Sequence, residues 1–77
     1  MKELIELIAK QLVDVPSQVS VTESEEEGRV RIELKVAKED MGRVIGKGGR
    51  VANSIRVLLR VAAAREGKRA SLDIVEP

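Results

Sequence analysis

The sequence predicts a small α+β domain in which a three-stranded sheet is packed by helices on one face. Three observations predict this class. A helical stretch opens the chain, two strand-like stretches follow it, and two helical stretches separated by a glycine-rich turn precede a last strand-like stretch. The expected order is therefore α-β-β-α-α-β. A chain of 77 residues has room for one domain, so we expect residues 1–77 to fold as a single unit.

Residues 2–13 have the spacing of an amphipathic helix that packs on the core. Its apolar residues form a broad arc, comprising Leu4, Ile5, Leu7, Ile8 and Leu12. The opposite face carries two glutamates, which would repel anionic lipid, so core packing is favoured over membrane binding. Pro16 ends the helix because a proline biases the residue before it, Val15, away from helical geometry.

Residues 19–23 and 30–36 are predicted to pair as an antiparallel hairpin. Val19 and Val21 alternate with polar residues in the first stretch. The second stretch alternates more regularly, and its apolar face consists of Val30, Ile32, Leu34 and Val36. A polar turn over residues 24–29, which contains Gly28, joins the two stretches and places an acidic run, residues 25–27, at the hairpin tip.

Two helices and a strand are expected in the second half of the chain. Residues 38–45 can form a short helix, with Glu39 and Asp40 near the positive end of its dipole. The tetrapeptide Gly46-Lys47-Gly48-Gly49 breaks this helix, and a second helix runs over residues 50–65. Residues 70–74 alternate as a third strand. The face of the second helix that we expect against the sheet comprises Ala52, Ile55, Leu59 and Ala62.

The residue types that are absent exclude several classes of function. The chain has no Cys and no His, which removes disulfides, thiolate nucleophiles, imidazole bases and nearly every zinc or transition-metal site. We therefore expect no enzyme, no cofactor and no small-molecule substrate. Phe, Tyr and Trp are absent as well, so nucleic-acid binding by aromatic stacking is excluded. No signal peptide or membrane span is recognisable, and a cytoplasmic protein is the expectation.

The formal charge of +1 conceals an uneven distribution. Residues 1–40 hold six basic and ten acidic side chains, a net charge of −4, whereas residues 41–77 hold eight basic and three acidic ones, a net charge of +5. From Met41 to Arg65 there are six Arg or Lys residues and no acid. This segment is typical of a local anion site, although a solvated basic helix face has the same composition.

The Gly46–Gly49 turn is the strongest candidate for such a site. A sharp connection between two helices explains one or two of its three glycines, and close approach of a ligand backbone is a further reason. The helix that follows directs its free N–H groups and its positive dipole end at the turn, and Lys47 and Arg50 add charge. The dinucleotide fingerprint fails because its third glycine would fall on Val51, and the P-loop fails because Gly42 is too close.

An aliphatic pair followed by Gly-x-x-Gly does fit, in the run Val44-Ile45-Gly46-Lys47-Gly48-Gly49-Arg50. Between two helices, after a hairpin and before a last strand, this motif resembles the KH signature, and the element order resembles the type II KH arrangement. Residues 41–47 and 62–69 are similar to the small stand-alone bacterial KH-domain RNA-binding protein family (KhpA), over residues 2–75 in all. One position departs: Ala52 stands where KH motifs usually place a large aliphatic residue, and Val51 or Ile55 is expected to fill that volume.

The resemblance implies that the turn clamps the backbone of about four nucleotides of single-stranded RNA. Gly46, Gly48 and Gly49 would permit contact with the phosphates, while Lys47 and Arg50 would neutralise them. The bases would lie in a shallow groove between the short helix and the neighbouring sheet edge. In that groove Val44 is a candidate lining residue and Arg43 a candidate polar contact, and Ile45 is either a lining or a core residue.

The resemblance further implies an RNA chaperone or post-transcriptional regulator without catalysis. Two alternatives stay open: a KH fold that serves as a protein-interaction scaffold, and a protein that binds single-stranded DNA. Val57, Leu58 and Val61 occupy a flank of the second long helix that the sheet does not obviously cover. They are the candidate interface of a homodimer, or of a heterodimer with another KH-domain protein; the competing interpretation is that Leu58 packs against the first helix.

Overall fold

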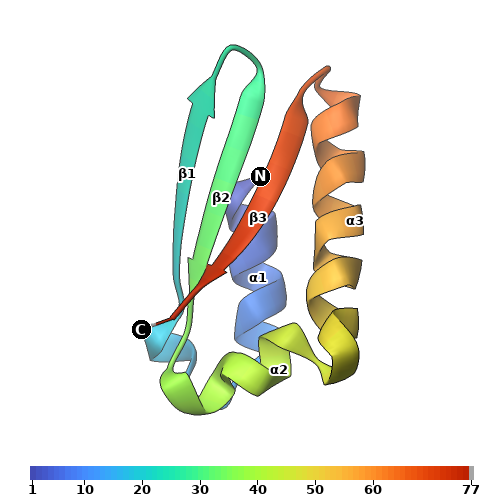
Figure 1. Cartoon of the computed structure of the whole chain (residues 1–77). Coiled ribbons are helices and arrows are strands. Elements are labelled where there is room, and N and C mark those ends of the chain that lie inside the picture. The colour runs from blue at the N-terminus through green and yellow to red at the C-terminus, as the bar shows by residue number, and fades with distance from the viewer. Residues whose placement is uncertain (77) are drawn as a thin grey trace.

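The computed structural model describes residues 1–76 and has the predicted order of elements (Figure 1). Its helices and strands are α1 (Lys2–Leu12), β1 (Ser20–Glu26), β2 (Arg29–Lys35), α2 (Met41–Ile45), α3 (Arg50–Arg65) and β3 (Arg69–Val75). Single 3₁₀ turns at Pro16–Gln18, Lys38–Asp40 and Lys47–Gly49 complete the connections. The α+β class and the α-β-β-α-α-β order are confirmed, although a 3₁₀ turn takes the place of the first part of the helix expected over residues 38–45.

The sheet has the order β1-β2-β3, with β2 in the centre. β1 and β2 are antiparallel, and β2 and β3 are parallel because α2 and α3 return the chain to the end where β2 began. The hairpin turn consists of Glu27 and Gly28 alone, with φ of 52° and 77°. This is the two-residue turn with two positive φ angles that suits the twist of a hairpin. The turn predicted over residues 24–29 was therefore too long: the polar residues before Glu27 pair with β2, so their composition resembled a turn while their backbone is strand.

The core lies between the sheet and the helices and is aliphatic. The predicted dry face of β2 is confirmed, because Val30, Ile32, Leu34 and Val36 are all buried. α3 contributes Ala52, Ile55 and Leu59 as predicted, but the fourth buried residue is Ala63, and Ala62 is only half-buried. Ala63 lies four residues, about one turn, beyond Leu59, so it continues the same helical stripe more closely than Ala62 does.

The apolar arc predicted for α1 was too broad. Only Ile5 and Ala9, one turn apart, are fully buried, and Leu7 is 61% exposed. A three-stranded sheet that is also covered by α3 leaves α1 a narrow contact stripe, so the leucines at its edges remain in solvent.

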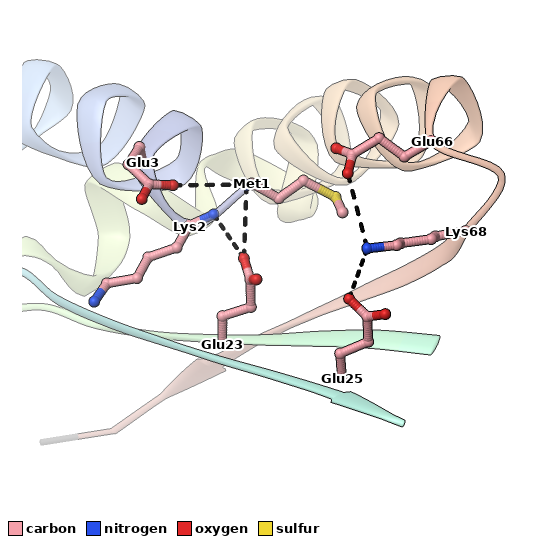
Figure 2. A network of polar contacts seen from close by, with 7 residues as sticks. All are labelled: Met1, Lys2, Glu3, Glu23, Glu25, Glu66 and Lys68. Atoms are coloured by element: carbon pink, nitrogen blue, oxygen red, sulfur yellow. Dashed lines mark hydrogen bonds and ion pairs between the residues drawn. The ribbon is translucent and has the colours of Figure 1, made fainter. Parts of the chain in front are cut away.

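Polar contacts join the middle of β1 to the start of α1, and its hairpin end to the connection between α3 and β3 (Figure 2). Glu23 accepts a hydrogen bond of 2.8 Å from the backbone N–H of Lys2, one of the free donors at the start of α1, and also lies 3.6 Å from the α-amino group of Met1. Near the hairpin tip, Lys68 Nζ lies 2.8 Å from Glu25 and 3.8 Å from Glu66. The hydrogen bond from Lys68 to Glu25 raises the pKa of Lys68 above its ordinary value.

Candidate nucleic-acid interface

All three glycines of the Gly46–Gly49 turn have positive φ: 75° at Gly46, 64° at Gly48 and 79° at Gly49. The sequence prediction assigned one or two glycines to backbone geometry and a further one to ligand approach. The turn in fact requires positive φ three times within four residues, because the chain must reverse from α2 into α3 with almost no linker. Backbone geometry alone therefore accounts for all three.

Gly46 has a second requirement, which is space. A Cβ at this position would lie 2.4 Å from Val51 Cγ2 and 2.8 Å from the Val51 backbone nitrogen. Val51 thus packs directly onto the α-carbon of Gly46 and fixes how closely α3 begins beside the end of α2. Val51 packs here and against the core, and Ile55 is a core residue, so both residues expected to compensate for Ala52 lie inside the fold.

Gly48 and Gly49 present bare backbone to solvent. A Cβ on Gly48 would meet nothing within 4 Å, and one on Gly49 would reach only Asn53 Nδ2, at 4.0 Å. No side chain caps the start of α3, although the N–H groups of Gly49 and Arg50 already donate within the turn, to the carbonyl oxygens of Gly46 and Lys47. Lys47 and Arg50 flank this backbone and are exposed, and neither takes part in an ion pair within residues 1–76. The turn is therefore a local concentration of unneutralised positive charge at the start of a helix.

Arg43 differs from Lys47 and Arg50 because acids hold it. Its Nη2 lies 2.8 Å from Asp14 Oδ2, and its Nε lies 3.4 Å from Asp40 Oδ1. Arg43 was predicted to make a polar contact with RNA at the rim of the groove, but its side chain is already paired within the protein. Its partner Asp40 is fully buried and accepts hydrogen bonds of 3.0 Å from the backbone N–H groups of Asp14 and Val15. Sequence reasoning placed Asp40 at a helix dipole and missed this role.

The prediction that the side chain of Val44 lines the groove is wrong. Val44 is 0% exposed and belongs to the core, whereas Ile45 is half-buried at the surface. An open hollow of about 470 Å³ is lined by Lys38, Met41, Ile45 and Glu76. It lies between α2 and the end of β3, which is where the sequence predicted a groove between the short helix and the sheet edge.

The flank of α3 is uncovered as the sequence suggested. Val57, Leu58 and Val61 are 54%, 52% and 50% exposed. The competing interpretation, in which Leu58 packs against α1, does not agree with this exposure. On the same helix, Arg56 donates from Nε to the carbonyl oxygen of Leu72 at 3.3 Å and from Nη1 to Asn53 Oδ1 at 3.2 Å.

Across residues 1–76 no three or more His, Cys, Asp or Glu side chains come together as metal ligands would. Over the same residues, no helix has the length and apolar character needed to cross a bilayer.

Comparison with known proteins gives a consistent result over nearly the whole chain. The family model described as the KhpA/KhpB KH domain matches residues 2–74. A protein of Clostridium acetobutylicum named RNA-binding protein KhpA is 52% identical over 75 residues, which cover 97% of this chain and 100% of that protein. Its namesake in Caldanaerobacter subterraneus is also 52% identical, with the same coverage. The one in Aquifex aeolicus is 46% identical over 76 residues, covering 99% of this chain and 96% of its own.

Proposed function

This chain belongs to the KhpA/KhpB family of KH domains, and from that membership we propose that it binds single-stranded RNA through the turn between α2 and α3. Relatives that match it end to end are named RNA-binding proteins. The observation that carries the proposal is the backbone of Gly48 and Gly49, which is open to solvent, lies at the uncapped start of α3 and is flanked by the unpaired cations Lys47 and Arg50.

In this mechanism the phosphates bind first and the bases follow. The N–H groups of the first turn of α3 that follow Arg50 donate to phosphate oxygens, which can approach because no Cβ stands over Gly48 or Gly49. Lys47 and Arg50 neutralise the charge. The bases of about four nucleotides then lie toward the hollow beside α2, where Met41 and Ile45 supply apolar surface. If ~3 phosphates are neutralised, the logarithm of affinity should fall with the logarithm of salt concentration with a slope near −2.

A single site that neutralises only a few phosphates is expected to bind RNA weakly, so useful affinity requires a second, linked site. We infer an RNA chaperone or post-transcriptional regulator of the cytoplasm, without a catalytic step, that gains affinity by pairing two KH domains. The pairing surface is the exposed strip Val57, Leu58 and Val61 of α3, in a homodimer or in a heterodimer with another KH-domain protein. The protein-interaction scaffold is disfavoured as an alternative, because a scaffold alone has no use for exposed, unpaired cations beside a bare glycine backbone.

The proposal is tested by fluorescence anisotropy with a short single-stranded RNA at low salt. The variant Lys47→Asp plus Gly48→Asp places two carboxylates at the turn, and we expect its affinity to fall at least tenfold. Gly48 has left-handed geometry, which Asp tolerates better than most residues, and its Cβ position is empty, so this variant should fold. Equal binding by wild type and variant would refute the site.

A matched control separates charge from shape. Lys47→Gln plus Gly48→Asn changes the same positions with neutral side chains of similar size. It should bind more weakly than wild type, because one cation is lost, yet more tightly than the acidic variant. A parallel titration with DNA of the same sequence addresses the second alternative: tighter RNA binding indicates that the 2′-OH is read, and equal binding favours a site that accepts either single strand.

A further inference from the structure

The outer edge of β1 is a strand edge that the protein itself leaves uncovered. The sheet has two edges, β1 and β3. The edge of β3 lies beside α3, and the carbonyl oxygen of Leu72 accepts a hydrogen bond of 3.3 Å from Arg56 Nε there. β1 lies on the other side of the sheet, at the left in Figure 1, and no helix runs along its outer edge. The edge of β1 is therefore the one that a further strand can reach.

The register of the hairpin shows which backbone groups of β1 point outward. In an antiparallel pair joined by a two-residue turn, the residues that flank the turn form a hydrogen-bonded pair, and such pairs alternate along the strands. Glu26 and Arg29 flank the turn. The N–H and C=O groups of Val21, Glu23 and Glu25 therefore point away from β2. Within the part of the chain that the structure describes, no group bonds to them.

β1 lacks the features that usually protect an edge strand. Folded proteins protect such edges with a proline, a lysine, a bulge or a very short strand. β1 has seven residues, pairs with β2 without interruption, and contains no proline and no basic residue. Its only charged residues are glutamates. Glu26, and Glu27 beside it in the turn, are exposed and take part in no ion pair among the described residues. The edge is therefore open and negatively charged.

The charge of the edge decides which strand fits it. A second copy of β1 would bring the glutamates of the two strands together, and like charges at neighbouring sheet positions are destabilising. A segment with Lys or Arg at alternate positions would instead place opposite charges beside Glu26 and Glu27. We propose that the free edge of β1 binds an extended, basic segment of a partner protein, which adds a fourth strand to the sheet. This inference does not depend on RNA binding.

The probe is a short peptide of alternating Lys and Val with blocked ends, and the measurement is amide hydrogen exchange followed by NMR. When the peptide is bound, exchange at the outward amides of Val21, Glu23 and Glu25 should become at least tenfold slower. The amides of Thr22 and Ser24 should change little, because they point toward β2. A peptide with the same side chains and every backbone nitrogen methylated cannot donate to a strand, so it should give no protection.

A pair of variants tests the backbone contact from the side of the protein. Glu25→Pro removes one outward N–H group, and an edge strand tolerates proline at such a position. Glu25→Ala is the matched control, because it loses the same carboxylate and the same contact with Lys68 but keeps the N–H group. We expect the peptide to bind Glu25→Pro at least tenfold more weakly than Glu25→Ala.

A second pair of reagents tests the charge. Glu26→Gln plus Glu27→Asn should weaken binding of the basic peptide roughly fivefold and make it less sensitive to salt. Asn is chosen at Glu27 because it tolerates the φ of 52° there. A peptide of alternating Glu and Val should not bind wild type.

Four outcomes would overturn the inference. They are no binding of the basic peptide, binding that leaves the outward amides unprotected, equal affinity of the Pro and Ala variants, and equal binding of the acidic peptide. Outward amides that become protected in the protein alone, as its concentration rises, would assign the edge to a second copy instead. If Glu25→Pro does not fold, the methylated peptide decides the question on wild type.

Discussion

Gly46, Gly48 and Gly49 share a positive φ, but the structure distinguishes the role of Gly46 from that of Gly48. Gly46 is needed by the fold, because Val51 occupies the space in which its side chain would stand. Gly48 is surrounded by open space, so its importance for the fold is limited to its backbone angle. The two positions therefore separate the folding role of the turn from its proposed binding role.

Alanine at these two positions should have unequal effects on stability. At Gly46 the backbone, with φ 75° and ψ 170°, lies in a region nearly reserved for glycine, and the added methyl group also meets Val51. Together these should lower the free energy of unfolding by about 3 kcal/mol. At Gly48, φ 64° and ψ 18° cost about 1 kcal/mol for alanine, with no clash. Urea unfolding followed by circular dichroism measures both, and similar losses would contradict the assigned role of Val51.

Individual site residues were predictable where a single local rule governs them. The glycines and the cations Lys47 and Arg50 follow from motif and helix start, and the structure places them together at one exposed turn. The assignments of Val44 and Ile45 could not be made from periodicity, because α2 has only five residues and gives less than two turns of pattern. Arg43 was misjudged for another reason: one of its partners, Asp14, lies 29 residues away and is brought close only by the tertiary fold.

At the scale of elements, one buried carboxylate joins the end of α1 to the start of α2. Asp40 lies at the boundary between the 3₁₀ turn and α2, and its two oxygens accept the N–H groups of Asp14 and Val15 in the segment that leaves α1. Arg43, one turn further along α2, contacts both Asp40 and Asp14. Since α2 leads directly into the Gly46–Gly49 turn, this network anchors the helix that carries the candidate site.

The variant Asp40→Asn should therefore be destabilising although it is nearly isosteric. An amide offers one acceptor oxygen where the carboxylate offered two, so one buried N–H group loses its partner and faces an NH₂ group instead. We expect a loss of about 1–3 kcal/mol in the free energy of unfolding. Glu39→Gln, at the neighbouring exposed acid, is the matched control and should change stability by less than about 0.5 kcal/mol. If the two variants unfold at the same urea concentration, Asp40 does not anchor α2.

The elements themselves were largely predictable, because most have either a regular alternation or a clear helical stripe. β2 alternates over its whole length and α3 has four buried positions on one stripe. β1 was predicted too short because it is an edge strand with one buried residue, Val21, so its outer half has no hydrophobic signal and depends on pairing with β2. The order of the strands and the parallel pairing of β2 with β3 depend on contacts between residues that are distant in the sequence. Local hydrophobic patterns do not contain this information, so it was available only through the resemblance to a known family.

On the scale of the whole molecule, the acidic run and the Gly46–Gly49 turn lie at opposite ends, although Arg29, Lys68 and Arg69 share the end of the acidic run. The hairpin tip with its acidic run lies at one end of the sheet, and α2 with the Gly46–Gly49 turn lies at the other (Figure 1). The turn has no acidic partner among the described residues, so it attracts a polyanion locally even though the formal charge of the chain is only +1. The turn is separate from Val57, Leu58 and Val61 of α3, which leaves this apolar strip available for a protein partner.

Self-association through that strip is the prediction that concerns the molecule as a whole. Val57, Leu58 and Val61 are each about half-exposed, and a second copy could cover them by packing α3 against α3. We expect wild type to sediment as a dimer and Val61→Arg as a monomer, since the new charge would be buried without a partner. Leu7→Arg is the control: Leu7 on α1 is 61% exposed, so a charge there should leave the dimer intact.

The monomeric variant should also bind long RNA more weakly, because it presents one turn instead of two. A wild type that remains monomeric at every concentration, with the same sedimentation and RNA binding as Val61→Arg, would remove the dimer from this account.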